Sequence, residues 1–209
     1  MITGFFGLPG VGKTTFLTMI SQKELKRIAR GKSKYEYVLT NFYCSGCHRI
    51  EYVDIGNYNF ENCLILLDEI SLFADNRDYK FFGKEKFLFF VLHRHYNCDI
   101  IYFTQDWASV DKKIRNLTSD LFYVKKAFST VNGLIFKPFQ SFSVARRIFR
   151  TLEINEYTKE IITGYRFPTT FERWFAKTIK LCYRPKWYKY FDSWEKPPKK
   201  DNFTYVLWE

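Results

Sequence analysis

The sequence predicts an α/β fold with a central parallel sheet flanked by helices and a small antiparallel extension toward the C-terminus. Residues 2–6 and 63–69 are short apolar runs, which are typical of strands covered on both faces. Segments with apolar residues at helical spacing alternate with such runs up to about residue 118, a pattern that implies right-handed βαβ units. A chain of 209 residues fits one domain with one sizeable core.

The expected elements follow one another in a regular order. Strands are expected at residues 2–6, 36–41, 63–69 and 99–105, and helices at 15–30 and 79–97. The second helix has an apolar stripe made of Phe82, Phe87, Phe90 and Val91. The turn-rich segment between residues 43 and 62 is expected to hold a small hairpin.

Beyond residue 118 the pattern changes. Residues 120–128, 134–139 and 141–149 are expected to form a short antiparallel set, followed by an amphipathic helix at about 170–182. The sequence shows no internal repeat and no long linker. We therefore expect residues 1–125 to form a nucleotide-binding core and residues 126–209 a basic, aromatic-rich extension packed on it.

The positive charge is concentrated in the C-terminal half. The formal net charge is +11; residues 1–110 carry 13 Lys/Arg against 12 Asp/Glu, whereas residues 111–209 carry 20 against 10. Such a field attracts polyanions, so DNA and an anionic membrane surface are the expected partners. The longest apolar runs are much shorter than the roughly 18 residues that indicate a membrane-spanning helix.

A glycine-rich loop near the N-terminus carries the strongest chemical signal. Residues 7–14, GLPGVGKT, match the GxxxxGK[ST] pattern between a strand and a helix, which predicts a P-loop nucleoside triphosphatase (NTPase). Backbone N–H groups of such a loop converge on phosphate, and the helix presents its positive end to the same anion. Lys13 is expected to bridge the β- and γ-phosphates of ATP and Thr14 to bind Mg²⁺. The expected ATP-binding residues are Gly7, Pro9, Gly10, Val11, Gly12, Lys13, Thr14 and Thr15.

Two carboxylates and an amide are expected beside this loop. Asp68 ends an apolar strand and is expected to hold Mg²⁺, and Glu69 follows it as the group that polarises the attacking water. This acidic pair indicates the additional-strand, catalytic-glutamate kind of ATPase. In that class, Gln105 at the tip of the strand DIIYFT would contact the γ-phosphate or the water.

Hydrolysis in this class also uses an arginine, often from a neighbouring subunit. Arg115 is the preferred candidate, with Arg94, Arg146 and Arg147 as alternatives. A homo-oligomeric ring is therefore expected.

Two further segments admit more than one interpretation. Cys44-Ser45-Gly46-Cys47-His48 spells CxxCH, but the five cysteines are an odd number and no signal peptide is expected, so two free thiols are expected in preference to a metal site. Residues 171–189 alternate aromatic and basic side chains, which fits a helix laid on the sheet, a DNA-tracking surface or a membrane-interface helix.

The chain resembles the zonular-occludens-toxin-like family, which includes the morphogenesis ATPases of filamentous phages. The resemblance covers about residues 1–125 and is carried by the phosphate loop, LTN at 39–41, LILLDE at 64–69, LHRHYNCDIIYFTQ at 92–105 and VDKKIRNL at 110–117. It implies a viral or prophage-encoded ATPase acting in the host cytoplasm, with peripheral contact at the inner membrane, that powers virion assembly or extrusion. Members of the family usually carry a transmembrane segment after the ATPase domain, and none is visible here.

Two alternatives remain at this point. One is a genome-packaging ATPase similar to the FtsK and HerA group, which would use the basic half to move DNA. The other is a nucleotide-dependent switch or scaffold with slow hydrolysis, against which Glu69 argues, because a switch needs no dedicated water-activating carboxylate.

Overall fold

The computed structural model of the chain describes residues 1–58, 60–72, 83–127, 141–154, 161–175 and 178–192. Its strands are β1 (Ile2–Phe6), β2 (Tyr37–Thr40), β3 (His48–Arg49), β4 (Cys63–Leu67), β5 (Asp99–Thr104), β6 (Asp120–Lys126), β7 (Phe142–Ile154), β8 (Ile161–Arg166) and β9 (Ile179–Tyr183). Its α-helices are α1 (Lys13–Ile28), α2 (Lys84–Leu92), α3 (Lys112–Leu117) and α4 (Thr170–Phe175), and the 3₁₀ helices η1 (Ile70–Leu72) and η3 (Arg184–Tyr190) complete the set.

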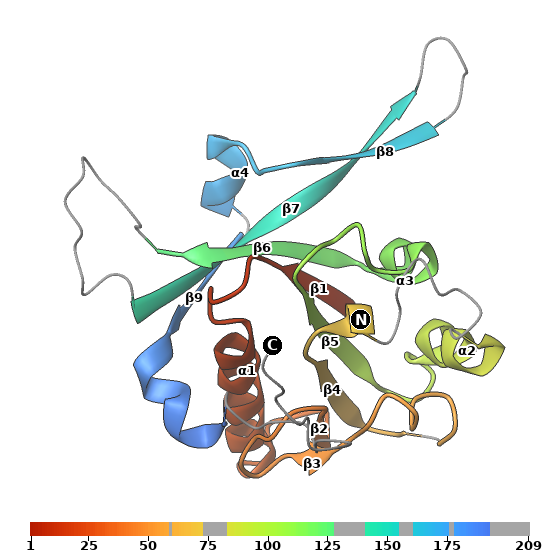
Figure 1. Cartoon of the computed structure of the whole chain (residues 1–209), viewed down its shortest axis with the longest axis vertical. Helices are drawn as coiled ribbons and strands as arrows, with labels where there is room; N and C mark the ends of the chain where they lie inside the picture. Colours follow the sequence, from red (N-terminus) through yellow and green to blue (C-terminus); the bar gives the residue numbers. More distant parts are fainter. Residues whose placement is uncertain (59, 73–82, 128–140, 155–160, 176–177, 193–209) are drawn as a thin grey trace, which may run out of the picture.

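The strands form one mixed sheet in the order β3-β2-β4-β5-β1-β6-β7-β8, with β9 paired to β7 (Figure 1). Strands β1 to β6 are parallel to one another. β5 lies between β1 and β4, so Tyr102 pairs with both Gly4 and Leu67. The predicted fold class, including the additional strand, is therefore confirmed. The carboxyl ends of β1, β4 and β5 meet at one edge of the sheet, where ligands bind in such folds.

Two apolar layers cover the sheet. α1 packs on one face, where Phe5 stacks on Phe103 and Phe122 with ring centroids 4.7 and 4.9 Å apart. α2 and α3 pack on the other face through Phe89, Phe90 and Ile114. Each fully buried side chain of this size contributes roughly 1.5–3 kcal/mol, so these contacts hold the helices to the sheet.

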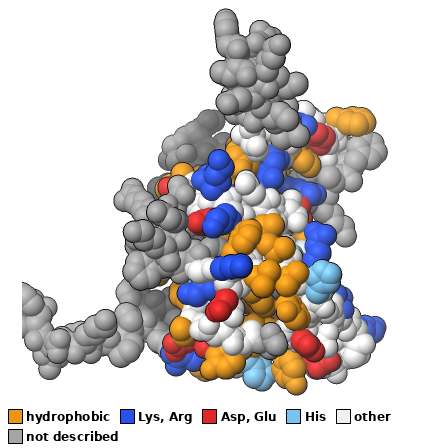
Figure 2. Space-filling model, turned by 90° about the vertical axis from the view of Figure 1, so that its right-hand side faces the viewer, with side chains coloured by type: hydrophobic (Ala, Val, Ile, Leu, Met, Phe, Trp, Pro, Cys, Tyr) orange, Lys and Arg blue, Asp and Glu red, His pale blue; other side chains and the backbone are white. Residues whose placement is uncertain are grey.

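The predicted helix over residues 79–97 is shorter in the structure. α2 ends at Leu92, and Asn97 adopts a left-handed φ of 53° that turns the chain into β5. Val91 was expected in the apolar stripe but is 41% exposed, and Phe89 is buried in its place. Residues 79–82 lie outside the described part of the chain. Figure 2 shows apolar side chains on the face to which α2 contributes, with lysine and arginine around them.

The hairpin expected between residues 43 and 62 is not found in the described part of that segment. β3 instead pairs parallel with β2, in the register Leu39 to His48. Gly46, with φ 79°, lies in the turn that precedes β3. The chain therefore returns to the sheet edge in the same direction as β2, and an antiparallel hairpin is excluded at this place.

The C-terminal prediction is partly wrong. β6 pairs antiparallel with β7, as expected, but its other neighbour is β1, to which it is parallel. The antiparallel pairing continues from β7 to β8 and β9. Residues 134–139 fall outside the described residues. β7 and β8 extend away from the rest of the sheet (Figure 1).

The amphipathic helix expected over residues 170–182 does not form. α4 ends at Phe175, and β9 pairs with β7 in the register Ser143 to Cys182. Cys182 is fully buried, whereas its neighbours Leu181 and Tyr183 are 59% and 46% exposed. The residue-by-residue pairing of β9 with β7 is that of an antiparallel strand, and the open edge of β7 supplies the backbone partners. In the part of the chain that the structure describes, we find no helix with the length and hydropathy needed to cross a bilayer.

Candidate functional site

The phosphate loop lies at the carboxyl end of β1, between that strand and α1. The Gly7 amide donates to the carbonyl oxygen of Thr104 at 3.2 Å, which ties the loop to β5. A Cβ atom at Gly7 would lie 2.4 Å from the backbone oxygen of Val124, and Gly12 has a left-handed φ of 88°. Both positions therefore require glycine.

Lys13 folds back over the loop. Its Nζ donates to the carbonyl oxygen of Gly7 at 3.1 Å. Burial lowers the pKa of Lys13, while the charges of Glu69 and Asp68 act in the opposite direction. The ammonium group thus lies within electrostatic range of both carboxylates.

The first turn of α1 meets the end of β4 directly. The Thr14 hydroxyl donates to Asp68 Oδ2 at 2.5 Å. Burial raises the pKa of Asp68, the Glu69 charge adds to that rise, and the Thr14 hydrogen bond and the Lys13 charge oppose it. A carboxylate with a raised pKa beside a lysine is the kind of group that gains from a bound cation.

Two residues that the sequence analysis did not assign to the site hold Asp68 in place. Asn41, directly after β2, donates through Nδ2 to the Asp68 carbonyl oxygen at 2.9 Å and accepts from the Asp68 amide at 2.7 Å. The Tyr52 hydroxyl donates to the carbonyl oxygens of Asp68 and Glu69, the latter at 3.0 Å. The sequence carries a signal for Asn41, because a polar residue at the carboxyl end of a predicted strand is a candidate for the site. No sequence pattern marks Tyr52 as a site residue.

Glu69 adopts a left-handed backbone conformation, with φ 53°. Its carboxylate oxygen Oε1 accepts from the Ser71 hydroxyl at 2.6 Å and from the Gln105 backbone amide at 3.2 Å. A non-glycine residue with positive φ costs on the order of 1–3 kcal/mol and persists where its surroundings hold it. Gln105 therefore lies beside Glu69, at the tip of β5 as predicted, and contacts it through the main chain.

The phosphate loop, the two carboxylates and Gln105 line one pocket of about 400 Å³. Its described lining residues are Pro9, Gly10, Gly12, Lys13, Thr14, Thr15, Asp68, Glu69, Gln105, Tyr188 and Phe191. The last two come from η3 and the residue that follows it, and the sequence analysis did not include them. Gly7 and Val11 belong to the same loop, and the Val11 carbonyl oxygen accepts from the Ser143 hydroxyl at 2.5 Å.

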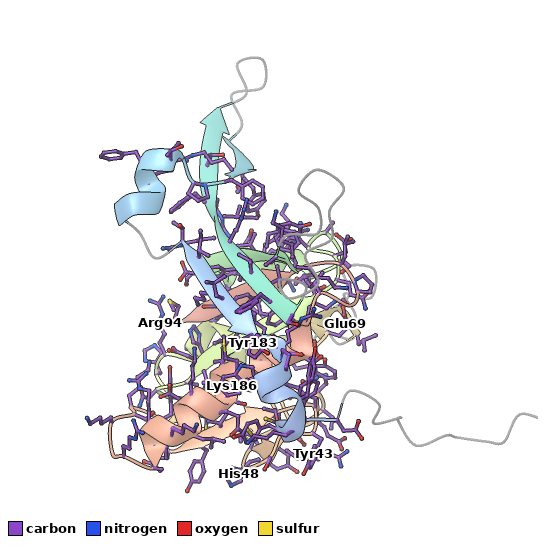
Figure 3. All side chains as sticks on the ribbon, turned by 90° about the vertical axis from the view of Figure 1, so that its left-hand side faces the viewer. Tyr43, His48, Glu69, Arg94, Tyr183 and Lys186 are labelled. Atoms are coloured by element: carbon purple, nitrogen blue, oxygen red, sulfur yellow. The ribbon has the colours of Figure 1, made fainter. Side chains whose placement is uncertain are left out.

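None of the four candidate arginines is among the described lining residues of this pocket. Arg115 lies in the last turn of α3, just before the amino end of β6, and its carbonyl oxygen accepts from Arg150 at 2.8 Å. Arg94 lies on the opposite side of the molecule from Glu69 (Figure 3). Arg146 and Arg147 lie on β7, where Arg147 forms an ion pair with Asp120.

The oxygen ligands Thr14 and Asp68 fit a magnesium ion. Mg²⁺ is commonly held by one or two carboxylates and substrate phosphates and keeps several waters. A hydroxyl and a carboxylate already in contact beside a phosphate loop are such a donor set. No cluster of three or more histidine, cysteine or acidic side chains suited to a metal occurs among the described residues.

The CxxCH segment is built differently from a metal site. Cys44 is buried against α1, with its Sγ 3.1 Å from the Ser21 hydroxyl, and the Cys47 thiol lowers the pKa of Cys44 to about 6. The His48 ring instead packs edge-on against Tyr37, with centroids 5.3 Å apart. All five cysteines are free thiols.

The aromatic and basic segment at 171–189 is not a single helix, so the membrane-interface helix and the helix-on-sheet interpretations are wrong. It is divided among α4, β9 and η3. Trp187 is only 5% exposed and belongs to the core cluster around Phe16 and Leu17. This tryptophan therefore stabilises the fold and is not available to stack on a base or to anchor in a bilayer.

The sheet order, the phosphate loop and the acidic pair at the end of β4 define the class: the chain has the fold of the P-loop NTPases. A family model, "Zonular occludens toxin (Zot)", matches residues 19–167. The chain belongs to this family, and the predicted resemblance is confirmed. The match begins inside α1 and ends directly after β8.

A solved structure agrees with this fold. The N-terminal domain of zonular occludens toxin from Neisseria meningitidis is similar with a TM-score of 0.51 and 15% identity, over 91% of this chain and 98% of that one. The genome packaging NTPase B204 of Sulfolobus turreted icosahedral virus 2, in complex with ATP-gammaS, has a TM-score of 0.43 and 11% identity, over 78% and 95%. The second likeness is too weak to carry an argument. No curated protein sequence matches the chain.

Proposed function

We propose that this protein is an ATP-hydrolysing motor of viral morphogenesis that couples ATP turnover to virion assembly or extrusion, or to DNA movement. The observation that carries the proposal is the meeting of the phosphate loop with Asp68 and Glu69 in one pocket. A nucleotide-binding fold without catalysis needs only the loop. Here a second carboxylate lies beside Asp68, at the tip of the strand next to β5.

Each residue has a role in this proposal. The loop amides from Gly7 to Thr15 and Lys13 would bind the phosphates, and Thr14 and Asp68 would hold Mg²⁺, which neutralises phosphate charge when bound. Glu69 would orient and polarise the attacking water as general base. Gln105 would sense the γ-phosphate, and its amide already positions the Glu69 carboxylate.

The arginine that stabilises the transition state is proposed to come from a neighbouring subunit of a ring. Arg115 lies near the amino ends of the strands, away from the pocket of its own chain. In this proposal Arg115 would act on the site of another copy. Mixing inactive Glu69→Gln subunits with Arg115→Ala subunits tests this: partial recovery of turnover supports the ring, and no recovery contradicts it.

DNA is the proposed polymeric partner, and the proposed basic extension, residues 126–209, is the part that would meet it. The described basic residues of this extension on β6 to β9 include Lys126, Arg146, Arg150, Arg166 and Lys180. Binding through phosphate contacts weakens steeply with salt, so the test is the slope of DNA affinity against salt concentration. A flat dependence would remove DNA from the proposal.

The place of action is proposed to be the host cytoplasm, with peripheral contact at the inner membrane. Two measurements separate this assembly motor from its alternatives. Flotation with anionic liposomes is expected for an assembly factor at the membrane and not for a free packaging motor. Stimulation of ATP turnover by DNA favours a motor over a slow nucleotide-dependent switch or scaffold.

A further inference from the structure

The segment from β9 to Phe191 lies beside α1 and the phosphate loop, although about 170 residues of sequence separate them. Cys182 and Trp187 are buried in the same core cluster as Val11 and Phe16. The Tyr190 carbonyl oxygen accepts from the Ser45 amide at 2.9 Å. This segment is therefore fixed at three places, by β-pairing, by core packing and by a backbone hydrogen bond.

The start of η3 touches the phosphate loop itself. A Cβ atom built on Gly12 would lie 2.6 Å from Cδ of Arg184 and 2.8 Å from the Ser143 hydroxyl oxygen. The aliphatic part of Arg184 thus packs directly on the residue before Lys13. Further along, Tyr188 of η3 and Phe191, which follows η3, line the pocket.

The described lining of the pocket has two chemically different parts. The loop glycines, Lys13 and the two carboxylates form a polar part suited to phosphate and a metal. Tyr188 and Phe191 form an aromatic part, with ring centroids 6.2 Å apart and planes inclined by 62°. Tyr188 is 50% exposed, so its ring is not used up in core packing.

We propose that Tyr188 and Phe191 form the wall that receives the nucleobase of the bound nucleotide. This inference rests on the proposed nucleotide-binding function and adds to it the part of the chain that recognises the base. An anion that carries a flat aromatic group matches a pocket whose lining combines an anion cradle with two aromatic rings. Bases gain free energy by stacking on aromatic side chains, whatever their hydrogen-bonding edges.

The test compares ligands with and without a base. ATP binding is measured by calorimetry for wild type, Tyr188→Ala and Phe191→Ala, and binding of inorganic tripolyphosphate is measured in parallel. Each alanine variant is expected to lose about ten-fold in ATP affinity. Affinity for tripolyphosphate is expected to stay within about two-fold of wild type, because the loop is unchanged.

Three controls make the outcome decisive. Tyr188→Phe keeps the ring and is expected to bind ATP as wild type does, and Tyr58→Ala removes an exposed tyrosine outside the pocket and is expected to have no effect. Wild-type ATP affinity in both alanine variants, or an equal loss of affinity for ATP and for tripolyphosphate, would overturn the proposal that Tyr188 and Phe191 receive the nucleobase. Failure of wild type to bind ATP would instead overturn the proposed function.

Discussion

The hydroxyl of Thr14 lies 2.5 Å from Oδ2 of Asp68, so that one hydrogen bond joins the start of α1 to the end of β4. These two residues are separated by 54 positions in the chain and are brought together by the order β4-β5-β1 in the sheet. The contact fixes the distance between the phosphate loop and the acidic pair. It also places the side-chain oxygens of Thr14 and Asp68, the two proposed ligands of Mg²⁺, side by side.

Thr14→Ala is expected to weaken ATP binding in the presence of Mg²⁺ by about ten-fold, because one of the two proposed protein ligands of the metal is lost. Most of the gain in ATP affinity that Mg²⁺ provides should therefore disappear. Calorimetric titration with ATP in the presence and absence of Mg²⁺ measures this. Thr14→Ser keeps the hydroxyl and should behave as wild type. An unchanged magnesium dependence in Thr14→Ala would exclude this hydroxyl as a ligand.

Glu69→Gln is expected to keep ATP binding and to lower turnover by about 10²–10⁴-fold, the usual contribution of a positioned general base. Phosphate release at saturating ATP measures the rate. Glu85→Gln, a change of the same kind on the exposed side of α2, serves as the matched control. Equal rates for Glu69→Gln and wild type would remove Glu69 from the proposed mechanism.

Asp68→Asn is expected to raise the melting temperature of the nucleotide-free protein near neutral pH. The folded-state pKa of Asp68 is raised by burial, so the stability linked to its proton is present at low pH and is lost as pH rises through that pKa. An asparagine amide carries no charge, so the free-energy cost of burying the ionised carboxylate is removed. Each kcal/mol gained in the free energy of unfolding shifts the melting temperature by roughly 2–4 °C. Thermal scans with and without Mg·ATP are the measurement; the ligand-induced shift should disappear in the variant.

Tyr52→Phe is expected to lower turnover more than ATP affinity. The hydroxyl holds the backbone of both Asp68 and Glu69, and Glu69 is in a left-handed conformation that needs such support. Loss of the hydroxyl should cost about 1 kcal/mol in stability. Rate and affinity measured on the same preparation test this, and equal effects on both would contradict a positioning role.

Asp99→Asn is expected to destabilise the protein in a pH-dependent way. Burial alone would raise the pKa of Asp99, but hydrogen bonds from the chain's amino group, Tyr35 and Lys34 outweigh it and lower the pKa to about 2. The stabilisation, roughly 2 kcal/mol, is therefore present above the unfolded pKa of about 3.9 and is lost as pH falls through about 2. Melting temperatures of the two proteins should converge in acid, and a constant difference would contradict the assignment.

The sequence predicted those parts of the site that local patterns control. The loop from Gly7 to Thr14 and the pair Asp68-Glu69 are marked by the strands that precede them, and a parallel sheet brings the carboxyl ends of neighbouring strands together. The roles of these residues are still predictions. Tyr52, Tyr188 and Phe191 were missed because they reach the site from loops or from a distant segment, and no local pattern specifies such placement.

The C-terminal elements were harder to predict for a similar reason. Residues 179–183 contain alternating and clustered apolar residues that fit a strand or a helix equally well in isolation. Pairing with β7 stabilises the strand conformation of these residues, because the free edge of β7 offers backbone hydrogen bonds to β9. Short segments of this kind take the structure that the completed sheet imposes on them.

The packing of Trp187 and Phe191 beside a loop that begins at Gly7 has a consequence for biosynthesis. A ribosome must release almost the whole described chain before the two walls of the pocket can meet. Until then the growing polypeptide contains the phosphate loop but lacks Tyr188 and Phe191, and the sheet lacks β9, which pairs with β7. The pocket is therefore complete only after residues 187–191 have left the ribosome.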